Sequence, residues 1–156
     1  MRLTEHFTVH EFTRSARHPE LMAVNLAASG PYLHNMLRVC AELEKLREHI
    51  ARPVYITSGF RCPELNAAVG GSPHSAHTRG LAADFVVKDF QDPDGLMLIY
   101  KWCAGNFADG GQIIFEHPDG RKPWIHFGLS TNPAGFILPL EKLLFIGGKY
   151  SRYERG

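Results

Sequence analysis

Three residues of the chain carry metal-binding side chains among small or apolar neighbours. His77 and Asp84 lie in residues 75–84 (SAHTRGLAAD), and His126 lies in residues 124–126 (WIH). Two imidazoles and one carboxylate are a donor set that catalytic zinc sites use, with a fourth position left for water. If the three side chains meet in space, these residue types predict a metal-dependent hydrolase.

The three can meet only if the strands that carry them turn the same face toward one another. Residues 81–87, 112–116 and 124–129 are rich in β-branched and aromatic residues, which predicts three strands. Alternate side chains of a strand share a face, and each of these strands has one apolar face for the core. The opposite faces carry Asp84, Glu116 and His126. A shift of one residue in any strand would remove this agreement.

A hairpin is predicted between the last two of these strands, because residues 118–120 (PDG) are a turn signal. If Glu116 lies opposite Trp124, then Ile114 lies opposite His126, and Glu116 is the diagonal neighbour of that histidine. Diagonal neighbours are roughly 7–8 Å apart, so a glutamate there can reach a water on a metal held by His126. We therefore predict Glu116 as the general base.

Other residues have a predicted place near the same site. His117 is the alternative base, because it directly follows Glu116. Arg61 follows a predicted strand and can clamp a substrate carboxylate through two parallel hydrogen bonds. Ser75 can bond the backbone in a local turn beside the first histidine. His74 is predicted to lie at the rim of the pocket and not on the metal.

The remainder of the chain predicts helices around a small sheet. A capping box at Thr8 and Glu11 predicts a short helix near residue 9. The other predicted elements are an apolar-striped helix from Pro31 to Ile50, a strand at 54–57, a short helix at 63–69, and a helix from Asp92 to about Asn106. Residues 13–30 are predicted to be irregular or briefly helical, and the tail beyond Ser130 to wrap around the domain.

The fold class predicted from these elements is α+β, a single domain over residues 1–156 with a small, largely antiparallel sheet flanked by helices. Strands and helices do not alternate regularly enough for a Rossmann-type fold. A length of 156 residues is sufficient for one core, and 44% hydrophobic with 21% charged residues is ordinary for a globular protein.

Charge and cysteine content exclude several classes of function. A formal net charge of +1 argues against a nucleic-acid partner. No run approaches the ~20 apolar residues of a membrane span. The N-terminus lacks the apolar core of a secretory signal, so we expect synthesis in the cytoplasm without a signal peptide. Three widely spaced cysteines predict neither a disulfide framework nor a thiolate metal site.

The motif Ser-x-His-x-x-Gly-x-Ala-x-Asp followed by Trp-x-His resembles the zinc D-Ala-D-Ala carboxypeptidase family, peptidoglycan metallopeptidases with a Hedgehog-type fold. Residues 58–66 (SGFRCPELN) and 7–12 (FTVHEF) also resemble segments of that family. The resemblance therefore extends from near the N-terminus to about residue 130. It implies a zinc peptidase that hydrolyses D-Ala-D-Ala or a neighbouring amide bond of peptidoglycan stem peptides, as a carboxypeptidase or an endopeptidase.

The resemblance also implies roles for particular residues. It makes Zn²⁺ the cofactor, with His77, Asp84 and His126 as its ligands. It implies that Arg61 and Ser75 contact the carboxylate of the substrate.

One position departs from part of the family. Some members place the catalytic acid three residues before the last histidine, where this chain has Pro123, which cannot serve. Members with a strand glutamate before Trp-x-His fit better, and they point again to Glu116.

The resemblance suggests a biological setting, because members without a signal peptide are often phage or prophage proteins. We expect a monomer that acts on the cell wall after release or as part of a phage particle. A non-catalytic phage structural or tail-associated protein that keeps a stabilising metal is the alternative. Glu116 together with Arg61 favours the enzyme, because a purely structural site needs neither.

Overall fold

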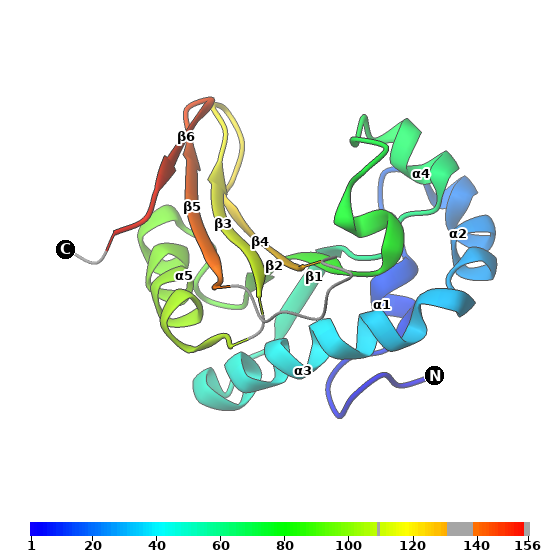
Figure 1. The fold of residues 1–156 in the computed structure, drawn as a ribbon, viewed down its shortest axis with the longest axis horizontal. Helices are drawn as coiled ribbons and strands as arrows, with labels where there is room; N and C mark the ends of the chain where they lie inside the picture. Colours follow the sequence, from blue (N-terminus) through cyan, green and yellow to red (C-terminus); the bar gives the residue numbers. More distant parts are fainter. Residues whose placement is uncertain (109, 131–138, 155–156) are drawn as a thin grey trace.

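A single sheet of six strands forms the frame of the part of the chain that the structure describes, residues 1–108, 110–130 and 139–154 of this computed structural model. The strands are β1 (Val54–Ser58), β2 (Ala82–Val87), β3 (Gly111–His117), β4 (Trp124–Leu129), β5 (Glu141–Ile146) and β6 (Lys149–Arg152). Their order in the sheet is β1-β2-β4-β3-β5-β6 (Figure 1). All neighbours pair antiparallel except β3 and β5, so the prediction of a largely antiparallel sheet is confirmed.

Helices surround this sheet in two groups. The α-helices are α1 (Val9–Thr13), α2 (Met22–Ala28), α3 (Leu33–Ile50), α4 (Pro63–Ala68) and α5 (Pro93–Asn106), and the 3-10 turns are η1 (Pro19–Leu21), η2 (Gly30–Tyr32) and η3 (Ala76–Arg79). Helices α3 and α5 pack against the sheet, whereas α1, α2 and α4 form a cluster at the other side of the molecule (Figure 1). No helix of the described residues is long and apolar enough to cross a membrane.

The core lies between the sheet and helices α3 and α5. It is built from the buried faces of the strands and the apolar stripes of the two helices, whose largest members include Phe85, Phe115, Phe127, Leu43, Leu96 and Tyr100. Because these side chains occupy one face of the central strands, the alternate side chains of the same strands are left on the opposite face. That opposite face carries the candidate site.

Capping residues in the sequence predicted correctly where α1 and α5 begin. Thr8 and Glu11 form the predicted capping box of α1, and the Asp92 side chain caps α5 through the Gly95 N–H. The long helix begins at Leu33, because Pro31 lies in the preceding 3-10 turn.

The prediction of a wrapping tail is wrong for residues 141–152. These residues form β5 and β6, which extend the sheet beyond β3. Gly147 and Gly148 both have positive φ angles and make the tight turn between the two strands. The residues of β5 (EKLLFI) do not alternate between polar and apolar, so the sequence did not indicate a strand, and in the structure the four central residues are all partly exposed. Residues 131–138 of the tail lie outside the described residues.

Candidate metal centre

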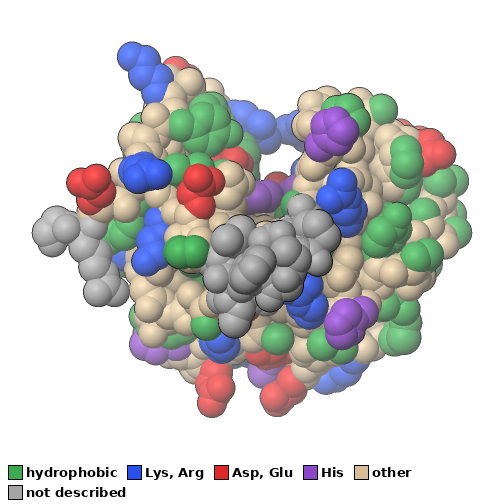
Figure 2. Space-filling model, viewed as in Figure 1, with side chains coloured by type: hydrophobic (Ala, Val, Ile, Leu, Met, Phe, Trp, Pro, Cys, Tyr) green, Lys and Arg blue, Asp and Glu red, His purple; other side chains and the backbone are tan. Residues whose placement is uncertain are grey.

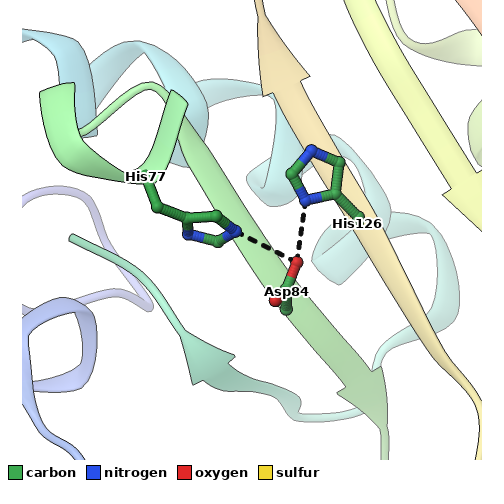
Figure 3. A group of neighbouring side chains, drawn as sticks. All are labelled: His77, Asp84 and His126. Carbon is green, nitrogen blue, oxygen red and sulfur yellow. Dashed lines mark hydrogen bonds and ion pairs between the residues drawn. The ribbon is translucent and has the colours of Figure 1, made fainter. Parts of the chain in front are cut away.

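His77, Asp84 and His126 meet on the face of the sheet opposite the core. Asp84 on β2 lies directly opposite His126 on β4 in the antiparallel register. His77 lies on η3. This turn is followed by Gly80, whose left-handed conformation turns the chain toward β2. Figure 3 shows both imidazole rings pointing toward the Asp84 carboxylate. The predicted convergence of these three side chains is therefore observed.

The separations of the donor atoms suit one metal ion. Asp84 Oδ1 lies 2.8 Å from His126 Nδ1 and 3.3 Å from His77 Nε2. The three donor atoms all lie within 4.8 Å of one another. Bonds of 2.0–2.1 Å in a tetrahedron place donors about 3.4 Å apart, so the residues present fit a zinc ion.

The orientation of His77 adds independent support for a cation. Its Nδ1 lies 2.7 Å from the Gly59 carbonyl oxygen, which can only accept, so Nδ1 carries the hydrogen. In the neutral ring this leaves a lone pair on Nε2 that faces a carboxylate oxygen. His77 is 2% exposed, and Nε2 has no hydrogen-bond partner in the described part of the chain. Two facing acceptors repel unless a proton or a metal ion lies between them.

Without a metal, protons hold the cluster together. Burial favours the neutral carboxyl of Asp84, but the charge of His77 and the hydrogen bond and charge of His126 lower its pKa overall. Burial likewise favours neutral His126, but the hydrogen bond and charge of Asp84 raise the pKa of this imidazole overall. The metal-free site therefore favours a carboxylate paired with an imidazolium.

This pairing predicts how the stability of chelator-treated protein depends on pH. The lowered pKa of Asp84 stabilises the fold above the ordinary value of 3.8, and this contribution is lost as pH falls. The raised pKa of His126 stabilises the fold fully below the ordinary value of 6.5, and this contribution is lost as pH rises through the raised value. We expect the contribution of the pair to be greatest between pH 3.8 and 6.5.

Thermal unfolding of metal-free protein across this range tests the expectation, with Asp84→Asn as the control that removes the pairing. The difference in melting temperature between the two proteins should shrink on either side of the window. A difference that keeps growing above neutral pH would contradict the assigned ion pair.

Glu116 and Arg61 lie near the three donors. Ile114 lies opposite His126 and Glu116 lies opposite Trp124, so the predicted hairpin register is confirmed. Burial and the neighbouring Asp84 raise the pKa of Glu116, although His126 and Arg61 act to lower it. Burial lowers the pKa of Arg61, which the charges of Asp84 and Glu116 partly offset.

These residues line one large cleft. The cleft has a volume of about 1840 Å³, and most of its walls come from the sheet, from residues 57–77, from residues 14–17 and from the turn at 121–123. Figure 2 shows the molecule hollowed between these parts, with a histidine side chain in the hollow. All three candidate ligands, Glu116 and Arg61 contribute to the lining. A molecule bound in this cleft would therefore lie near the candidate metal ligands, the Glu116 carboxylate and the Arg61 guanidinium together.

The remaining predicted residues occupy different places. Ser75 lines the cleft and caps η3, where its hydroxyl accepts from the His77 N–H at 3.3 Å. His74 and Pro123 line the cleft without joining the group of donor atoms, and His117 is not part of the described lining.

Sequence reasoning missed two contacts in and around the cleft. The Gly59 carbonyl bonds His77 through the backbone, which no side-chain pattern reveals. Arg121 lies over the Trp124 ring, with its guanidinium carbon 4.9 Å from the ring centroid.

The family comparison agrees with this geometry. A family model described as Peptidase M15 matches residues 5–116, which include two of the three candidate metal ligands and Glu116. No curated protein matches the chain significantly.

Proposed function

Because the chain belongs to the Peptidase M15 family, whose members depend on zinc, we propose that it hydrolyses an amide bond of peptidoglycan stem peptides. The observation that carries the proposal is the meeting of His77, Asp84 and His126 in a cleft that also contains Glu116 and Arg61. The bond that we propose is D-Ala-D-Ala or a neighbouring amide. The three donors would hold Zn²⁺.

Zinc at this position would supply Lewis acidity, which polarises a carbonyl and lowers the pKa of water toward about 7. The chain supplies the groups that move protons and hold the substrate. In this proposal Glu116 accepts a proton from water and delivers it to the leaving amine. Its raised pKa is closer to neutral pH than that of an exposed glutamate, which favours both transfers.

Arg61 is the proposed contact for a carboxylate of the substrate. Its guanidinium is planar and can donate two parallel hydrogen bonds to a carboxylate. Its Nε is buried and has no hydrogen-bond partner among the described residues, so the side chain has donor capacity left for a ligand. Ser75 lies on the same wall and is the second proposed contact.

Digestion of defined muropeptides tests the proposed function. Zinc-loaded protein is incubated with stem peptides that end in D-Ala-D-Ala, and products are identified by mass spectrometry. Release of D-alanine indicates a carboxypeptidase, whereas internal fragments indicate an endopeptidase. Bound zinc without cleavage of any stem peptide near neutral pH would contradict the proposal and favour the non-catalytic alternative.

A further inference from the structure

A buried asparagine far from the metal ligands in sequence is bonded to the backbone on both sides of Arg61. Asn25 on α2 is 0% exposed. Its amide donates to the Phe60 carbonyl at 3.0 Å, and its oxygen accepts from the Cys62 N–H at 2.7 Å. A third bond, to the Thr13 carbonyl at 2.8 Å, ties the same side chain to the end of α1. A buried amide is stabilising only when it is bonded in this way.

The backbone that Asn25 holds also contacts the metal centre. We call residues 59–62 the 59–62 segment. Its Gly59 carbonyl accepts a hydrogen bond from His77 Nδ1 at 2.7 Å. The Arg61 N–H donates to the His77 carbonyl at 3.0 Å. The same four residues therefore orient one proposed metal ligand and carry the proposed substrate contact.

The 59–62 segment is also hydrogen-bonded to α1. The Phe60 N–H donates to the Phe12 carbonyl at 2.7 Å. A Cβ atom at Gly59 would lie 2.5 Å from that carbonyl oxygen, so any larger residue must push the segment away. Asn25 and Phe12 thus fix the segment from two directions.

We propose that Asn25 is a positioning residue for the active site. Through the 59–62 segment it holds the Gly59 carbonyl against His77 and fixes the backbone from which Arg61 reaches the cleft. Loss of the Asn25 amide would release both the Gly59 carbonyl and the backbone at Arg61. The part that concerns Arg61 rests on the proposed function, whereas the part that concerns His77 depends only on metal binding.

The principal experiment measures zinc affinity, by competition with a chelator, in Asn25→Ala and Asn25→Asp. Asn25→Asp keeps an acceptor for the Cys62 N–H but places a carboxylate beside two carbonyl oxygens. We expect both variants to bind zinc about 10-fold more weakly, at the lower end of losses seen when an outer-shell partner of a metal ligand is removed. Leu96→Ala is the control, because this core truncation on α5 lowers stability from the opposite face of the sheet.

A second measurement is independent of activity and of zinc. Long-range ¹H–¹⁵N NMR of metal-free protein reports which ring nitrogen of His77 carries the hydrogen. We expect the Nδ1–H tautomer in the parent and in Leu96→Ala, and a mixture of the Nδ1–H and Nε2–H tautomers in the Asn25 variants. Gly59→Ala displaces the same segment from the α1 side and should give the same signature.

A double-mutant cycle tests the connection to Arg61. If Asn25 acts through Arg61, the loss in kcat/KM of the double variant Asn25→Asp/Arg61→Lys should be smaller than the product of the losses in the two single variants.

Parent-like zinc affinity and an unchanged His77 tautomer in both Asn25 variants would overturn the proposal. If the parent cleaves no stem peptide, the proposed function fails, while the affinity and NMR measurements still decide the role of Asn25. If Asn25→Ala does not fold, Asn25→Asp and Gly59→Ala carry the same measurements.

Discussion

Glu116→Gln is expected to lower kcat/KM for peptide hydrolysis by roughly 10²–10⁴-fold, the usual contribution of a general acid–base group, while zinc stays bound. Glutamine has nearly the same shape as glutamate but cannot accept the proton. Glu116 lies outside the group of three donor atoms, so the metal site keeps its ligands. The measurements are the rate of muropeptide cleavage and the zinc content of the purified variant.

His117→Gln is the matched control for this prediction. The two residues are neighbours on β3, and adjacent side chains of a strand point to opposite faces. Because Glu116 lines the cleft and His117 is not part of the described lining, His117→Gln should retain nearly full activity. If His117→Gln is inactive and Glu116→Gln is active, the assignment of the base is reversed.

The register of the central strands could be predicted because two faces with different chemistry constrained it. Asp84 and His126 each lie between two apolar residues that must face the core, Glu116 follows the apolar Phe115, and a short turn connects two of the strands. Any slip would have buried charges and exposed aromatic rings. The capping box located α1 for a different reason, because the hydrogen bonds between Thr8 and Glu11 are local and depend only on residues three apart.

The supporting contacts could not be predicted, for two physical reasons. Asn25 lies in a segment of short helices whose packing depends on distant residues, so its sequence neighbours say nothing about Phe60 or Cys62. The Gly59 carbonyl acts through the backbone, which has no residue-specific signal. The parallel pairing of β5 with β3 joins two strands that are not consecutive in the chain, and the residues of β5 do not alternate between polar and apolar, so the sequence did not indicate this strand.

The second large effect expected is the loss of zinc in His77→Ala. The variant lacks one of three protein donors, and the two that remain cannot complete the site of a catalytic zinc ion. We expect no stoichiometric zinc after dialysis, and activity at background. His74→Ala is the matched control, because His74 lies three residues earlier on the cleft wall outside the donor group. Zinc content by atomic spectroscopy separates the two variants.

Full zinc occupancy in His77→Ala, or its loss in His74→Ala, would contradict the assigned ligands. The zinc content of His77→Ala must be interpreted together with the activity of Glu116→Gln. A stabilising metal in a non-catalytic protein would be lost from His77→Ala just as a catalytic one would. Only an enzyme loses its turnover in Glu116→Gln while it keeps zinc. The two variants together therefore distinguish a site that holds metal from one that uses it.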